Sequence, residues 1–255
     1  MTAYGIYDPF SAIVAQSFQA RCLWLSSFCY SLAQGLPDMG LLPFISEIGV
    51  ISRIRAVSKV PLIVDIDNGF GSKKHALAIS ERLVACGVDA VCIEDKHSPK
   101  ISSLYKGGQS LLETDQFCGI IREIKRSLPS LKVLARLEGI IYGQDVDEID
   151  ERIKKCMEAG ADCVVLHNVT DNIDKLRSLI SQNAQVPFGI IPTKYMQKLN
   201  QLSNENIVLV IYANQLIRSC YDSMGKTVNH LCRDPSSVDS EIPSIETMKA
   251  LVVRE

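Results

Sequence analysis

One unit recurs along this chain and limits the folds open to it: a helical pattern ends at a glycine, an acid follows, and a short apolar run closes on a polar residue. Residues 85–94 read Ala-Cys-Gly-Val-Asp-Ala-Val-Cys-Ile-Glu, and residues 158–167 read Glu-Ala-Gly-Ala-Asp-Cys-Val-Val-Leu-His. When the glycines are aligned, Gly87 matches Gly160 and Asp89 matches Asp162. Glycine is common just beyond a helix C-terminus, and unbroken apolar runs are typical of parallel strands that are covered on both faces.

Similar runs predict eight strands, with helical patterns between most of them. The strands are expected near residues 4–7, 21–25, 62–67, 90–94, 133–137, 163–166, 188–191 and 207–212, and the helices over 72–86, 112–128, 145–159, 172–182 and from 215 onward. Strands that alternate with helices form a parallel sheet. Eight such units in 255 residues predict an α/β fold of the (β/α)₈ TIM barrel type.

A doubly wound open sheet is the alternative fold, but the chain has neither the G-x-G-x-x-G nor the G-x-x-x-x-G-K-[ST] motif of nucleotide sites. We expect a single domain over residues 1–255. A polar, turn-rich segment over 233–243 is expected to lead to a detached C-terminal helix over 244–252.

Charge and cysteine usage exclude several classes of function. The net charge is −2 with mixed signs, whereas a nucleic-acid surface needs a basic stripe. The nine cysteines show no C-x-x-C spacing, so we expect buried reduced thiols rather than disulfides or a zinc site. No apolar run reaches 18 residues and no basic segment opens the chain. We therefore expect a cytoplasmic protein without a targeting segment that binds a small molecule, and neither nucleic acid nor a membrane.

Two carboxylates follow the third predicted strand. Asp65 and Asp67 alternate on a strand taken to run over 62–67, so both are expected on one face. Converging like charges are costly unless a cation lies between them, and Mg²⁺ prefers such oxygen ligands. A solvated loop that carries two acids by chance is the alternative reading.

Charged residues also end other predicted strands, and these ends share one rim of a barrel. Glu94 ends the fourth strand, Arg136 and Glu138 lie two apart on the fifth, and His167 ends the sixth. This pattern predicts a metal site with acids from several strands, while Arg136, His167 and Lys100 meet an anionic small molecule. The alternatives are an ion pair between Arg136 and Glu138 and a core histidine at position 167.

The segment after the fourth strand, residues 94–108, is long, polar and bounded by Pro99 and a glycine pair. It is predicted to be a mobile lid that brings Lys100 and a hydroxyl over the site. A disordered surface loop is the alternative.

Several of these motifs together resemble one family. The stretch Asp65-Ile66-Asp67-Asn68-Gly69-Phe70-Gly71 matches D-x-D-[TN]-G-[YF]-G, and Glu94-Asp95-Lys96-x-x-Pro99-Lys100 matches its lid. Further matches are Ala135-Arg136-x-Glu138, Leu166-His167 and Pro192-Thr193-Lys194-Tyr195. The chain resembles the phosphoenolpyruvate mutase and phosphonopyruvate hydrolase branch of the isocitrate lyase superfamily over nearly its whole length.

The resemblance implies a TIM barrel whose last helix packs on, or swaps with, a neighbouring subunit, in a homodimer or homotetramer. It also implies Mg²⁺ bound directly by Asp65, with Asp38, Asp67 and Glu94 holding the waters of the ion. The implied catalytic residues are Asp38, Lys100, Ser102, Arg136 and His167. The implied substrate-binding residues are Trp24, Ser26, Ser27, Phe28, Ser103, Arg136 and His167.

The resemblance also bears on the reaction. The carbon–carbon lyases of the superfamily carry a cysteine in a K-[KR]-C-G-H motif, and residues 96–108 and 140–143 contain none. The mutase lid normally has asparagine and the hydrolase has threonine where this chain has Ser102, and the G-S-G turn after the second strand is replaced by Leu25-Ser26-Ser27. Lys194 matches the mutase. We expect a phosphoenolpyruvate mutase; a phosphonopyruvate hydrolase, a divergent enzyme acting on a related phosphonate or 2-oxo acid, and a non-catalytic binding relative are the alternatives.

Overall fold

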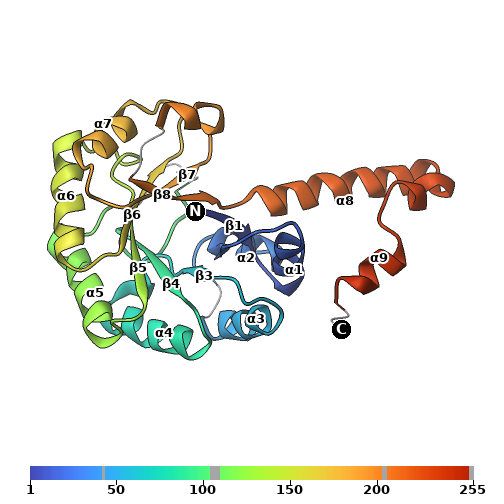
Figure 1. The fold of residues 1–255 in the computed structure, drawn as a ribbon, viewed down its shortest axis with the longest axis horizontal. Coiled ribbons are helices and arrows are strands. Elements are labelled where there is room, and N and C mark those ends of the chain that lie inside the picture. The colour runs from blue at the N-terminus through green and yellow to red at the C-terminus, as the bar shows by residue number, and fades with distance from the viewer. Residues whose placement is uncertain (42–43, 104–109, 203–205, 253–255) are drawn as a thin grey trace.

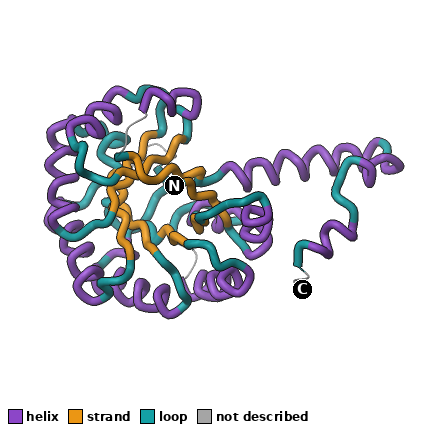
Figure 2. The backbone as a smooth tube through the Cα atoms, in the orientation of Figure 1, coloured by secondary structure: helices purple, strands orange, loops and turns teal. Residues whose placement is uncertain are grey.

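The computed structural model of the chain describes residues 1–41, 44–103, 110–202 and 206–252, and its strands close into a parallel barrel (Figures 1 and 2). Each strand pairs with the next in chain order, and the eighth pairs with the first. The strands are β1 (Thr2–Ile6), β2 (Leu23–Leu25), β3 (Leu62–Asp65), β4 (Ala90–Glu94), β5 (Lys132–Leu137), β6 (Cys163–Asn168), β7 (Phe188–Pro192) and β8 (Ile207–Tyr212). The predicted TIM barrel is confirmed, and the open sheet is excluded.

Helices surround the strands, except for the last two, which project away from them (Figure 2). They are α1 (Pro9–Ser17), α2 (Ser27–Ala33), α3 (Phe44–Val57), α4 (Lys73–Ala85), α5 (Thr114–Ser127), α6 (Val146–Glu158), α7 (Asp174–Gln182), α8 (Gln215–Arg233) and α9 (Ile245–Ala250), with short 3₁₀ helices at η1 (Gly69–Gly71), η2 (Met196–Leu202) and η3 (Pro235–Ser240). The first three helices were not predicted. The start of α1 is nevertheless marked in the sequence, since Asp8 and Ser11 form a capping box and Pro9 follows the cap.

The recurring unit has a structural reason. Gly87 and Gly160 follow α4 and α6 with φ values of 80° and 98°, a left-handed conformation that favours glycine. The carboxylate of Asp89 accepts a hydrogen bond from the backbone N–H of Leu62, at 2.9 Å, and Asp162 does the same for Val133, at 2.9 Å. In both repeats the acid therefore ties the start of its strand to the start of the strand before it.

Apolar side chains fill two layers. Inside the barrel lie Ala3, Trp24, Ile63, Cys92, Leu134, Val165, Ile211 and their neighbours. Between the barrel and the helices lies the larger layer, which includes Val64, Val91, Phe117, Ile121, Ile153 and Leu166. The alternation along each strand divides its side chains between these layers, and polar residues are left to the rim where the strands end.

The last helices leave the barrel. Helix α8 extends away from the strands, and after its far end the chain turns back to α9, which lies within the segment where the sequence predicts a detached helix (Figure 1). Neither helix contains a buried residue. Within the described ranges, none of the helices has the length and apolar character needed to cross a membrane.

Candidate functional site

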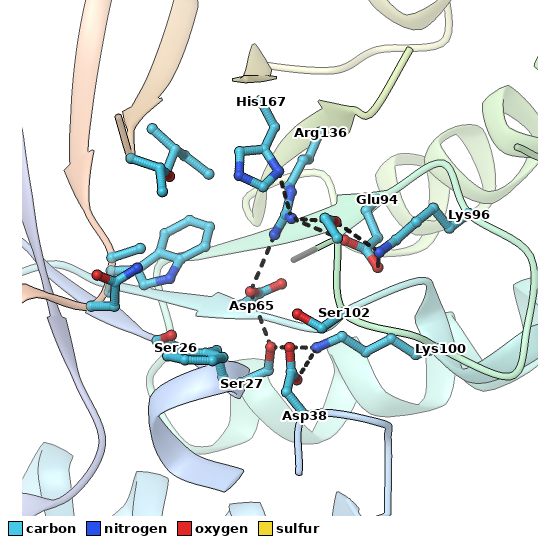
Figure 3. A pocket seen from close by; sticks show the side chains of 17 residues that line it. Ser26, Ser27, Asp38, Asp65, Glu94, Lys96, Lys100, Ser102, Arg136 and His167 are labelled. Carbon is cyan, nitrogen blue, oxygen red and sulfur yellow. Dashed lines mark hydrogen bonds and ion pairs between the residues drawn. The ribbon is translucent and has the colours of Figure 1, made fainter. Parts of the chain in front are cut away.

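A pocket opens at the rim formed by the carboxyl ends of the strands, with a cavity volume of about 60 Å³ (Figure 3). Its lining combines acids, cations, hydroxyls and an imidazole from the ends of seven strands, β2 to β8, with Asp38 and the segment after β4. The lining residues are Trp24, Ser26, Ser27, Phe28, Asp38, Asp65, Glu94, Lys96, Lys100, Ser102, Ser103, Arg136, His167, Ile191, Thr193, Ala213 and Asn214. Active sites of TIM barrels form at this rim.

The structure brings Asp65 and Asp67 together, but not on one face of a strand as predicted. β3 ends at Asp65, and Asp67 lies in a turn with a φ of 51°, so the strand predicted to run through residue 67 is wrong at its end. The backbone N–H of Asp67 instead donates to the Asp65 carboxylate at 3.2 Å, and the Asp67 carbonyl accepts from Glu94 N–H at 2.7 Å. Both side chains are buried, so a turn held by backbone bonds, and not strand alternation, brings them together.

The described part of the lid segment, residues 96–103, covers the pocket. Lys100 is 8% exposed, and its ammonium lies 2.5 Å from Asp38, 2.6 Å from Asp67 and 2.9 Å from the Ser27 hydroxyl. These carboxylates raise the pKa of Lys100, since Asp67 and Asp38 together outweigh the effect of burial. Residues 104–109, including the glycine pair of the predicted lid, lie outside the described residues.

Lys96 fastens this segment from inside. Its fully buried ammonium donates to the Ile101 carbonyl at 2.9 Å and the Ser103 hydroxyl at 3.0 Å, and it lies 3.0 Å from Glu94. The Ser103 hydroxyl in turn donates to Glu138 at 2.7 Å. Residues 96–103 are therefore bonded to the ends of β4 and β5.

Glu138 is the centre of a buried network at the end of β5. It accepts from Arg136 Nε at 2.6 Å, and its Oε1 lies 2.8 Å from His167 Nδ1. Although burial raises the pKa of Glu138, Arg136 and His167 outweigh it and hold the pKa well below its usual range. Burial lowers the pKa of His167, so the ring is neutral near pH 7. Arg136 Nη2, which can only donate, also lies 2.9 Å from His167 Nδ1, so this nitrogen contacts both a donor and an acceptor, and the two contacts correspond to different tautomers.

The Arg136 guanidinium reaches the remaining acids, lying 3.6 Å from Asp65 and 3.3 Å from Glu94 (Figure 3). The ion pair with Glu138 that the sequence left as an alternative is therefore present, and Arg136 lines the pocket as well. The sequence also left Lys100 and Arg136 to face an anion, whereas here both are paired with acids. Buried carboxylates need such counter-charges because their desolvation is costly.

Negative charge is in excess in this cluster. Around the pocket, five described carboxylates (Asp38, Asp65, Asp67, Glu94 and Glu138) face three cationic side chains (Lys96, Lys100 and Arg136), which leaves two negative charges unbalanced when all are ionised. Burial, followed by Asp67, raises the pKa of Asp65 to about 6, and burial raises that of Glu94 to about 7. Both Glu94 oxygens are buried without a well-formed hydrogen bond. Among the described residues, however, no three His, Cys, Asp or Glu side chains converge as a ready-made metal site.

The structure gathers every residue that the sequence assigned to the site. Asp67 alone does not line the pocket, although it pairs with Lys100. Sequence reasoning counted Glu138 among the strand-end acids but gave it no role of its own. It gave no site role to five residues that line the pocket, namely Lys96, Ile191, Thr193, Ala213 and Asn214. Lys194, which matches the mutase motif, is exposed and does not line the pocket.

Comparison with known sequences gives one family and several relatives. A model of the phosphoenolpyruvate phosphomutase family matches residues 1–232. A phosphonopyruvate hydrolase of Variovorax sp. is 29% identical over 253 residues, which are 96% of this chain and 87% of that protein. A phosphoenolpyruvate phosphomutase of Streptomyces hygroscopicus is 29% identical over 235 residues, 90% and 75% of the two chains. A 2-methylisocitrate lyase of Halalkalibacterium halodurans is 25% identical over 251 residues, 97% and 82% of the two chains.

Solved structures share the whole barrel. A phosphonopyruvate hydrolase crystallised with oxalate and Mg²⁺ superposes with a TM-score of 0.91 at 26% identity, covering 98% of this chain and 89% of the other. A phosphoenolpyruvate phosphomutase from Streptomyces platensis subsp. rosaceus also superposes with a TM-score of 0.91, at 28% identity, and the match covers 98% of this chain and 90% of the other. Mutase and hydrolase relatives are thus equally similar to this chain in fold.

Proposed function

Because the chain belongs to the phosphoenolpyruvate phosphomutase family, we propose that it is a Mg²⁺-dependent phosphoenolpyruvate mutase that interconverts phosphoenolpyruvate and phosphonopyruvate. The observation that carries the proposal is the pocket itself, in which Asp65 and Glu94 face Lys100, Arg136 and His167 at the strand ends. A small substrate that carries two anionic groups and bridges to a cation suits this mixture of charges.

The acids fit a hard divalent cation. An excess of two negative charges and raised pKa values at Asp65 and Glu94 are what an oxygen-ligated cation relieves, and the Glu94 oxygens, which lie near Lys96 and Arg136, still lack a well-formed hydrogen bond. We propose that Asp65 binds Mg²⁺ directly and that Asp38, Asp67 and Glu94 hold its waters. When bound, the ion supplies positive charge that stabilises the enolate of pyruvate.

The reaction requires no proton in either direction. The bond between phosphorus and the enol oxygen of phosphoenolpyruvate breaks, and its electron pair stays on pyruvate as an enolate. Carbon 3 of the enolate then attacks the phosphorus, and the oxygen on carbon 2 becomes a carbonyl. Arg136 and His167 are proposed to hold the anionic substrate during this transfer, while Lys100 and Ser103 exclude water as residues 96–103 close.

Hydrolysis of phosphonopyruvate is the second candidate, and Ser102 favours it. Ser102 is 5% exposed and lines the pocket at the position where the resemblance implies asparagine in mutases and threonine in the hydrolase. A small hydroxyl shields the transferring phosphoryl group less than an amide, so water can take that group. The products are then phosphate and pyruvate, whose enolate takes a proton at carbon 3.

Phosphorus NMR of phosphonopyruvate mixed with the chain and Mg²⁺ tests the two candidates together. Phosphoenolpyruvate as the product supports the mutase, and inorganic phosphate with pyruvate contradicts it in favour of the hydrolase. An Asp38→Asn variant is the control, because it should stop either reaction. Mg²⁺-dependent binding without turnover would instead support the non-catalytic alternative.

We also propose that the chain assembles as a homodimer or homotetramer through α8. No residue of this helix is buried, and Tyr221, Met224 and Val228 are 83%, 63% and 59% exposed along one face. Exposed apolar stripes of this kind mark protein interfaces. Light scattering on a sizing column measures the assembly, and a monomer at micromolar concentration would contradict it.

A cytoplasmic location is proposed on the state of the cysteines. All nine are free, and Cys92, Cys118 and Cys156 are fully buried. Free buried thiols suit a reducing compartment. Fractionation of cells that express the tagged chain tests this placement.

A further inference from the structure

The hydroxyl of Ser27 lies between two groups of the pocket that come from distant parts of the chain. It accepts a hydrogen bond from Lys100 Nζ at 2.9 Å and donates to Oδ2 of Asp65 at 3.2 Å (Figure 3). Ser27 is the first residue of α2, Lys100 lies on the segment that covers the pocket, and Asp65 ends β3. One serine thus joins three separate elements.

The chemistry of a hydroxyl decides which group donates and which accepts in each hydrogen bond of this bridge. A serine carries one proton and an ammonium can only donate, so the bond from Lys100 leaves the serine proton for the carboxylate of Asp65. Without Lys100 nearby the hydroxyl is free to rotate, and Asp65 loses a fixed donor. The position of residues 96–103 therefore decides whether Ser27 adds a fixed donor at Oδ2 to the one that Oδ1 of Asp65 already receives from the Asp67 N–H.

This bridge is specific to the side chain at position 27. The family resemblance implies a glycine in this turn, which has no hydroxyl to bridge the two groups. The side chains of the other partners of Lys100, Asp38 and Asp67, are carboxylates that can only accept, and Asp67 reaches Asp65 through its backbone N–H, which does not depend on Lys100.

We propose that Ser27 is a positioning residue that couples closure of residues 96–103 to the orientation of the Asp65 carboxylate. The proposal rests on the proposed function for its effect on turnover, because Asp65 is the acid placed next to the cation. Its effect on the covering segment is independent of any reaction.

Acetylation of Lys100 by trace acetic anhydride, followed by mass spectrometry, measures that effect in the ligand-free chain. An amine held among three oxygens acetylates slowly. The Ser27→Ala variant is expected to acetylate Lys100 roughly tenfold faster, since one hydrogen bond to a charged group is lost. A Ser80→Ala variant is the matched control, because that buried hydroxyl donates only to the Ala76 carbonyl on α4 and should leave the rate unchanged.

Measuring kcat and KM with phosphonopyruvate distinguishes the proposed positioning role from a merely structural one. Ser27→Ala is expected to lower kcat about tenfold and to change KM by less than about threefold, because the bridge acts once the segment has closed. Lys100 acetylation within twofold of the wild-type rate, or a loss carried by KM, would overturn the proposal. If wild type turns over neither phosphonopyruvate nor phosphoenolpyruvate, the proposed function fails, and the acetylation rates alone still decide the role of Ser27.

Discussion

An Arg152→Met substitution should reveal how much a buried ion pair contributes to holding the rim together. Arg152 of α6 is 6% exposed, and its Nη1 lies 3.3 Å from the fully buried Asp95 and donates to the Leu112 carbonyl at 2.9 Å. Asp95 also accepts from the backbone N–H of Glu138 at 2.9 Å, and its own carbonyl accepts from Leu112 N–H at 2.9 Å. Arg152 therefore links Asp95, at the end of β4, to the return from the lid segment at Leu112, while Asp95 itself reaches the end of β5.

The magnitude follows from leaving one charge alone in the interior. Breaking a buried ion pair by removing one partner costs about 3–5 kcal/mol, against a total folding stability of about 5–15 kcal/mol. Methionine retains an apolar stem of similar length, so little of the loss comes from packing. We expect Arg152→Met to lose about 4 kcal/mol in equilibrium urea unfolding at pH 8.5.

The loss of folding stability caused by Arg152→Met should be larger at high pH than at low pH. Burial raises the pKa of the Asp95 carboxyl to about 7 in the wild type, and Arg152 opposes this rise. An acid whose folded pKa is raised is protonated in the fold below that pKa and costs stability as the pH rises. Removing Arg152 raises the pKa further, so the loss should be large at pH 8.5 and shrink by pH 5.5, where only the bond to Leu112 is missing.

A double variant, Arg152→Met with Asp95→Asn, is the control, because it removes both charges and keeps the acceptor for the Glu138 N–H. It should recover most of the stability at pH 8.5. A loss below about 1 kcal/mol in the single variant, or an equal loss at both pH values, would refute the reasoning.

Three further predictions concern the site and the assembly. The pKa values of Asp65 and Glu94 are raised to about 6 and 7, so these acids lower the stability of the fold as the pH rises through these values. Mg²⁺ should therefore raise the thermal unfolding midpoint more at pH 8 than at pH 5.5. An equal shift of the midpoint at both pH values would contradict the assignment of these acids to the cation. Ser102→Asn should shift the product ratio from phosphate toward phosphoenolpyruvate in phosphorus NMR, and an unchanged ratio would mean that this position does not select the outcome. Tyr221→Glu should weaken self-association at least tenfold by light scattering, whereas Lys226→Glu on the same helix, where an exposed ammonium pairs with Asp222, should not.

Local pattern was enough to predict the barrel. All eight strands lie where apolar runs end in polar residues, because strands covered on both faces leave little freedom for other residue types. The helices over residues 9–57 were missed, although the cap at Asp8 was readable. Their apolar residues lack the clear division into faces that marks the later helices, so periodicity alone did not separate them from the strands around them.

The sequence by itself determined which side chains share the rim, because the carboxyl ends of parallel strands meet at one edge of a barrel. Asp65, Glu94, Arg136 and His167 were assigned on that ground and all line the pocket. The contacts that these side chains and Lys100 make could not be predicted in the same way. Only the tertiary structure decided that Lys100 lies between Asp38 and Asp67, because these residues come from three separate loops and no local periodicity relates them.

The tertiary structure also decided the turn at Asp67, the bridge through Ser27 and the departure of α8 from the barrel. Each depends on contacts between parts of the chain that are distant in sequence. The turn depends on the Glu94 amide and the bridge on residues 96–103, and no core packs against α8 in the part of the chain that the structure describes. Sequence patterns report which face of an element is apolar or charged. They do not report which distant group meets that face, and the chemistry of this site depends on those meetings.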